Sequence, residues 1–102
     1  MQPSSVSPVR VSVIMPARNA APFIDEALRS VREQSMADLE ILVIDDGSSD
    51  STPVIVEGHA REDDRVRLLR GAGRGPAAAR NIGLSAGKGA WAVMVGADEL
   101  IL

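Results

Sequence analysis

Short apolar runs alternate with longer segments of helical spacing along this chain, and this alternation most restricts how the chain can fold. Four runs rich in Val, Ile, Leu and Met are typical of buried strands. They cover residues 11–15, 39–44, 66–69 and 90–95. Three segments of helical periodicity separate them, at about residues 22–34, 52–62 and from residue 76 to Gly87 or Gly89. The order predicts an α/β fold in three layers, a mostly parallel sheet with helices on both faces.

Local signals place the helix starts and the side chains of the core. Each predicted helix has a proline in its first turn, where no backbone N–H is needed: Pro22, Pro53 and Pro76. We expect Asp25 and Glu26 to lie in the first turn of the first helix, and Asp25 to pair with Arg29. The expected apolar face of that helix consists of Phe23, Ala27, Leu28 and Val31. Trp91 and the methionines are expected in the core, and His59 on the surface.

Composition excludes several kinds of site. The 102-residue chain has no Cys and one His, so a metal would need oxygen ligands, which favours Mg²⁺ or Mn²⁺. Its net charge is −3 with 11 scattered basic residues, which argues against nucleic-acid binding. No apolar run reaches the roughly 18–20 residues that a membrane span requires. We expect a cytoplasmic protein, with a peripheral position at the inner face of the membrane as an alternative. Residues 1–10 are expected to form a flexible N-terminal lead.

Polar segments follow three of the predicted strands, and in a parallel sheet they meet at one edge. They cover residues 16–19, 45–48 and 96–99. Ligands of such sheets bind beyond the carboxyl ends of the strands. Carboxylates of Asp46 and Asp98 at this edge would suit a divalent cation and a hydroxyl-rich ligand. The local pattern leaves an alternative of equal weight, in which residues 45–48 only form a turn before the next helix and Glu99 is a solvated carboxylate.

A glycine-rich loop at residues 71–75 precedes the third helix and resembles an anion-binding loop, since backbone N–H groups at a helix start can hold phosphate. Arg74 and Arg80 are candidates for pairing with a diphosphate. For Arg74 we favour the role of a solvated loop charge. For Asn81, satisfying the backbone groups of the rim is as reasonable as contacting a ligand.

Four motifs in order resemble the N-terminal half of family 2 glycosyltransferases of the GT-A fold. They are VSVIMPARN at 11–19, ILVIDDGSSDST at 41–52, GPAAARNIGLSAGKGAW at 75–91 and VMVGADE at 93–99. The resemblance extends from about residue 10 to residue 100. It implies a Rossmann-like half-domain that binds a nucleoside-diphosphate sugar of the UDP or dTDP type, and inverting transfer of the sugar to an acceptor hydroxyl.

The resemblance also implies roles for particular residues. Those expected to bind the nucleotide sugar are Pro16, Ala17, Arg18, Asn19, Asp46, Gly75, Arg80, Asn81, Ala97 and Asp98. Among them Asp46 would contact the base, and Arg80 and Asn81 would border the diphosphate and sugar. Asp98 and Glu99 would hold Mn²⁺ or Mg²⁺. The family usually has Asp-Ala-Asp-Asp at that point, whereas this chain has Gly96 in place of the first Asp, so metal binding is expected to be weaker or rearranged.

The family's acceptor site and catalytic base belong to a C-terminal half, so we expect no catalytic residue within residues 11–102 and a domain truncated at its C-terminus. A non-catalytic remnant or partner-binding module, able to self-associate through its exposed truncated face, is therefore the main alternative. A receiver-type signalling domain is a remote one. The acidic pair of a receiver should follow the first strand, and no acid ends the strand at 66–69.

Overall fold

The computed structural model describes residues 9–34 and 38–96. The predicted lead at 1–10 lies mostly outside these residues. Seven elements follow in order: β1 (Val11–Ala17), α1 (Ala21–Arg32), β2 (Leu39–Asp45), α2 (Thr52–Glu62), β3 (Val66–Arg70), α3 (Pro76–Ala86) and β4 (Trp91–Met94). None of the helices in the described ranges is long and apolar enough to cross a membrane.

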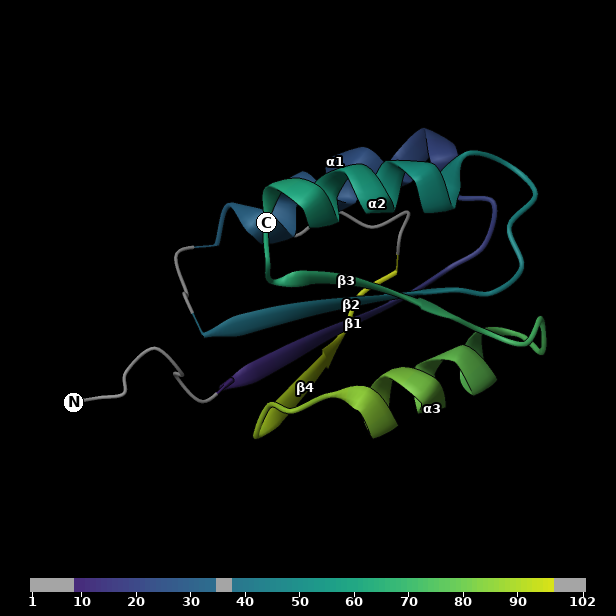
Figure 1. Cartoon of the computed structure of the whole chain (residues 1–102). Coiled ribbons are helices and arrows are strands. Elements are labelled where there is room, and N and C mark those ends of the chain that lie inside the picture. The colour runs from purple at the N-terminus through teal and green to yellow at the C-terminus, as the bar shows by residue number, and fades with distance from the viewer. Residues whose placement is uncertain (1–8, 35–37, 97–102) are drawn as a thin grey trace.

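The four strands form one parallel sheet in the order β3-β2-β1-β4. Helices α1 and α2 cover one face, and α3 lies on the other (Figure 1). This confirms the α/β fold and the three layers. The central strands β1 and β2 carry the most buried side chains, and β4 is exposed at one edge.

Alternation along each central strand supplies a core on both faces of the sheet. One set of side chains, which includes Met15 and Val43, packs with Ile24 and Leu28 of α1 and with Val56 of α2. The opposite set is smaller and comprises Ile14, Leu42, Ile44 and Ala79. Helix α3 approaches this face closely at Gly83, where an added Cβ would lie 2.4 Å from Ile14 Cγ2.

Several element boundaries differ from the sequence prediction. Strand β1 continues through Pro16 to Ala17, because both residues stay in parallel register with β2. Helix α1 begins at Ala21 and ends at Arg32, so its first turn contains no acidic residue. The expected favourable placement of Asp25 and Glu26 was therefore wrong. The predicted pair does form, with Arg29 Nε 2.9 Å from Asp25 Oδ2.

Three large apolar side chains expected in the core are exposed instead. In α1, Ile24 takes the buried position, and Phe23 is 51% exposed. On β4, Trp91 is 70% exposed and Met94 is also exposed, because this edge strand has a neighbour on one side only. Among the methionines of the described residues, Met15 alone is in the core.

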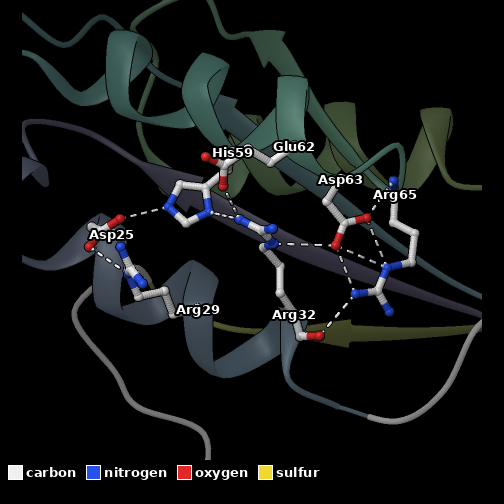
Figure 2. A network of polar contacts seen from close by, with 7 residues as sticks. All are labelled: Asp25, Arg29, Arg32, His59, Glu62, Asp63 and Arg65. Carbon is white, nitrogen blue, oxygen red and sulfur yellow. Dashed lines mark hydrogen bonds and ion pairs between the residues drawn. The ribbon is translucent and has the colours of Figure 1, made fainter.

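His59 was expected on the surface, but it is buried between α1 and α2 (Figure 2). Its Nε2 lies 2.7 Å from Asp25 Oδ1, and its Nδ1 lies 2.7 Å from Arg32 Nη1. Because a guanidinium can only donate, Nδ1 must accept and Nε2 must carry the proton given to Asp25. Hydrogen bonds from Arg29, and then from His59, lower the pKa of Asp25. The imidazole thus links the two helices that cover this face.

A second polar cluster, the amino-end cluster, ties the start of β1 to β2 and to the α3–β4 connection. Glu40 Oε2 accepts from Ser12 Oγ and from the Lys88 backbone N–H, both at 2.6 Å. Ser12 Oγ in turn accepts from Gly89 N at 2.9 Å, and Arg67 Nη1 lies 3.7 Å from Glu40 Oε1. Ser12 and Glu40 are both buried, so these bonds satisfy polar groups inside the fold.

Candidate functional site

The strand register brings the carboxyl ends of three strands level at Ala17, Asp45 and Arg70. Two adjoining clefts lie at this edge of the sheet. The first, of about 510 Å³, is lined by Pro16, Ala17, Arg18, Asn19, Ala20, Phe23, Asp46, Gly75, Pro76 and Gly96. The second, of about 530 Å³, is lined by Pro16, Pro76, Ala77, Arg80, Met94, Val95 and Gly96. Pro16, Pro76 and Gly96 line both, so the clefts form one continuous rim.

Reciprocal hydrogen bonds fasten the turn after β1 to the turn after β2. Asn19 has a positive φ of 50°, and its backbone N–H donates to Ser48 Oγ at 2.8 Å. Its side-chain Oδ1 accepts from the backbone N–H of Ser49 at 2.8 Å. The exchange holds the Pro16–Asn19 wall of the first cleft in one position.

The start of α1 is held in the same way. Ala20 N donates to Thr52 Oγ1 at 2.9 Å, and Ala21 N donates to Asp50 Oδ2 at 3.1 Å. Thr52 Oγ1 then donates to Asp50 Oδ1 at 2.5 Å, and this bond is the main cause of the lowered pKa of Asp50. The polar residues of the second motif therefore do more than precede α2. They also fasten the turn after β1 and the start of α1 to the turn after β2.

Asp46 holds the glycine-rich loop through both of its carboxylate oxygens. Oδ1 accepts from Gly73 N and Oδ2 accepts from Gly75 N, each at 2.8 Å. Both glycines have positive φ, 71° and 102°, which other residues rarely adopt. Gly71 is equally constrained, since a Cβ there would lie 2.5 Å from Asp46 Oδ1. The predicted anion-binding loop thus binds an anion of this chain, the carboxylate of Asp46.

The adjacent carboxylate of Asp45 has different partners. It is buried, accepts from Ser48 N at 3.3 Å, and lies 3.5 Å from Arg70 Nη1 at the end of β3. Asp45 therefore closes the turn after β2, whereas Asp46 lies against the first cleft.

The predicted site residues divide between the two clefts. Pro16, Ala17, Arg18, Asn19, Asp46 and Gly75 line the first, and Arg80 lines the second. Asn81, one residue along α3, lines neither. Arg74 is exposed in the loop and lines neither. Within the described parts of the chain, Arg18 and Arg80 have no ion-pair partner.

The remaining predicted residues, Ala97, Asp98 and Glu99, lie outside the described residues. Across 9–34 and 38–96, no three acidic or histidine side chains group closely enough to hold a metal ion. Gly96 lines both clefts, so the two predicted metal ligands follow a rim residue within three positions in the sequence.

Sequence reasoning missed some of the lining. Phe23 was assigned to the core because its spacing to Ala27 fits a helical stripe, yet it borders the first cleft. Pro76 was assigned only to a helix start, but it lies where the clefts meet. The sequence feature that comes closest to predicting the place of Phe23 in the cleft is its position, four residues after the PARN motif.

Comparison with known proteins agrees with this geometry. The sequence profile of Glycosyl transferase family 2 matches residues 12–102. The uncharacterized glycosyltransferase EpsJ of Bacillus subtilis is 36% identical over 91 residues, which cover 89% of this chain and 26% of EpsJ. The chain thus spans about a quarter of the length of this relative.

Solved structures of glycosyltransferases share the fold. S. aureus TarS 1-349 in complex with UDP-GlcNAc has a TM-score of 0.81 at 30% identity, covering 87% of this chain and 26% of that one. The mannosyltransferase PcManGT from Pyrobaculum calidifontis, in complex with GDP-Man and Mn²⁺, has a TM-score of 0.83 at 35% identity, covering 97% and 32%. Profile, relatives and fold agree, and this chain belongs to glycosyl transferase family 2.

Proposed function

We propose that the rim binds a nucleoside-diphosphate sugar and that the chain is the donor-binding part of an inverting glycosyltransferase. The observation that carries the proposal is the meeting of the predicted motif residues of β1, β2 and α3 along one pair of clefts. The complexes of TarS with UDP-GlcNAc and of PcManGT with GDP-Man support a nucleotide-sugar donor. Between a pyrimidine and a guanine base, we propose the pyrimidine, in a donor of the UDP or dTDP type.

Asp46 is proposed to accept a hydrogen bond from the base. A carboxylate has about four lone-pair sites. Gly73 and Gly75 occupy two of them, so capacity remains for an N–H group at the edge of a base. The same two bonds keep the carboxylate in place before the ligand arrives, which reduces the entropy cost of binding.

Arg80 is proposed to face the diphosphate. Arg80 lines the second cleft, together with Pro16 and Pro76, which the two clefts share. A cation at this point would stabilise the negative charge that develops on the diphosphate as its bond to the anomeric carbon breaks. Gly75, in the first cleft just before α3, and Asn81, the residue after Arg80, are proposed to border the same ligand.

The metal would be held by Asp98 and Glu99, whose hard oxygen ligands suit Mn²⁺ or Mg²⁺. When bound, a divalent cation supplies positive charge that stabilises the leaving diphosphate. The complex of PcManGT with Mn²⁺ supports this part of the proposal. An acceptor hydroxyl would attack the anomeric carbon while a carboxylate base outside residues 11–102 takes its proton.

Titration calorimetry tests the proposal. We expect UDP with Mn²⁺ to release heat on binding to the wild-type chain, and Asp46→Ala to abolish the signal. Asp64→Ala is the matched control, because this carboxylate lies outside both clefts. A wild-type chain that binds no pyrimidine or guanine diphosphate would contradict the proposal.

One observation favours the alternative of a partner-binding module. Strand β4 is the edge of the sheet, carries no charged residue over Trp91–Met94, and exposes Trp91, Val93 and Met94. Edge strands without charges are prone to pair with another strand. A second copy would then join along β4. Sedimentation equilibrium should show a dimer that Val93→Lys dissociates, and a monomer at all concentrations would contradict this role.

A further inference from the structure

Phe23 is a large apolar side chain that the fold does not bury. The inward face of α1 consists of Ile24, Ala27, Leu28 and Val31, which are at most 1% exposed. Phe23 is 51% exposed in the first turns of the same helix. Its ring also lines the first cleft, together with Asp46. Phe23 therefore contributes little to the core and much to the cleft.

The backbone beneath Phe23 is firmly held. Its N–H donates to Ala20 O at 2.8 Å, and Ala20 N donates in turn to Thr52 Oγ1. Ala21 is anchored by Asp50. The exposure of the ring thus arises at a fixed helix start, and the ring is available without reorganisation of the chain.

The chemistry of the first cleft distinguishes it from the second. Its walls carry the Phe23 ring with Pro16 and Pro76, and a buried carboxylate lies among them at Asp46. The second cleft has Arg80 but no aromatic residue. A flat ring with polar edges fits the first combination, because its faces can stack while its edge donates to the carboxylate. A phosphate would gain little from an aromatic wall.

We infer that Phe23 is a ligand-contacting residue that packs against the nucleobase of the donor and contributes to base selection. The inference rests on the proposed function and extends it to a residue outside the family motifs quoted above. It commits the first cleft to the base, and so leaves the second cleft, with Arg80, to the diphosphate and sugar.

The composition of the chain makes this contact directly observable. Phe23 is the only phenylalanine and there is no tyrosine, so its ring protons can be labelled selectively and assigned without ambiguity. With UDP bound, we expect nuclear Overhauser effects between these ring protons and H5 and H6 of uracil. Contacts of H5 and H6 with Trp91 or Leu84, and not with Phe23, would overturn the inference.

Affinities of variants give an independent measure. Stacking of a base on an aromatic ring corresponds to about 10- to 100-fold in affinity, so Phe23→Ala should weaken UDP binding by that factor. Phe23→Trp should restore binding, and Phe23→Leu should restore it only in part. Pyrophosphate, which has no base, should bind Phe23→Ala and wild type equally. Val54→Ala removes another exposed apolar side chain, 64% exposed and outside both clefts, and should change nothing.

The outcomes separate this inference from the proposed function. If wild type binds no nucleotide, the proposed function fails. If wild type binds UDP and Phe23→Ala binds it equally well, the base does not contact the ring and the inference alone fails. Equal weakening of UDP and pyrophosphate would mean that Phe23 acts by shaping the helix start, which also overturns it. A matching thermal melt of Phe23→Ala and wild type excludes misfolding as the cause.

Discussion

The two ends of the sheet use similar residues for different purposes. At the amino end, Ser12 and Glu40 are buried and bond to the Lys88–Gly89 connection, so they cross-link β1, β2 and the segment after α3. At the carboxyl end, Asp46 is equally buried but lies against an open cleft that Phe23 also lines. Buried carboxylates alone therefore do not identify the site. The rim differs because its clefts are bordered by an aromatic ring and by two arginines, Arg18 and Arg80, that have no ion-pair partner among the described residues.

Removal of the amino-end carboxylate should have the largest effect on stability. Glu40→Ala leaves the buried Ser12 hydroxyl and the part-buried Lys88 N–H without their acceptor, and we expect a loss of about 3 kcal/mol in the free energy of unfolding. Chemical denaturation measures it. Glu57→Ala, at an exposed site on α2, should stay within about 0.5 kcal/mol. A Glu40→Ala variant as stable as the wild type would contradict a stabilising role for the amino-end cluster.

A matched pair of glycine substitutions contrasts the two ends. In Gly89→Ala the new Cβ would lie 2.7 Å from the backbone N of Ser12, so stability should fall by about 2 kcal/mol. In Gly71→Ala the Cβ would meet the Asp46 carboxylate and displace it from Gly73 and Gly75. Thermal melts and UDP titrations should show mainly a loss of stability for Gly89→Ala and mainly a loss of UDP affinity for Gly71→Ala. The reverse pattern would invert our assignment of the two ends.

Asn19 should have a smaller effect at the rim. Asn19→Ala removes the acceptor for Ser49 N. It also places an alanine at a φ of 50°, a left-handed conformation that alanine tolerates less well than asparagine. We expect a loss of about 1.5 kcal/mol. Asn19→Gly loses the same hydrogen bond but relieves the backbone, so it should be the milder of the two in a thermal melt. Equal effects would show that the backbone conformation costs nothing.

Acid should act mainly at the amino end, where Asp63 pairs with Arg65 just before β3. Hydrogen bonding from Arg65 lowers the pKa of Asp63 from 3.8 to about 2. A depressed pKa in the folded state gives stability that is present above pH 4 and is lost as pH falls toward 2. After allowance for solvent screening this amounts to about 1 kcal/mol. Asp63→Asn should flatten the stability profile over that range, and an unchanged profile would contradict the assignment.

The central strands, the helix order and the motif placement could be predicted from the sequence because they depend on local patterns. Branched apolar runs mark β1 and β2, and parallel connectivity brings their polar ends to one edge. The errors concern contacts between distant residues. His59 lies in the polar last turns of α2, yet Asp25 and Arg32 enclose it, 34 and 27 residues away along the chain. Trp91 is a large apolar residue of the kind usually found in a core, but it lies on an edge strand. Only the strand order reveals that β4 is at the edge of the sheet.

Phe23 and Asp46 show the same limit at the site. Either Phe23 or Ile24 would fit the helical period at the edge of the apolar face of α1, so the period cannot tell which of the two is buried. In the folded protein Ile24 is the buried one. The Asp46 carboxylate was predicted at the rim, but its bonds to Gly73 and Gly75 depend on how the β3–α3 loop folds back over β2.

Amide chemical-shift mapping with UDP tests the central claim that the carboxyl-end rim is the donor site. In the presence of Mg²⁺, which is diamagnetic, we predict the largest shifts at Asn19, Gly73 and Gly75, with Lys88 and Gly89 unchanged at the other end. Shifts confined to Lys88 and Gly89, or no shifts at saturating nucleotide, would contradict the account.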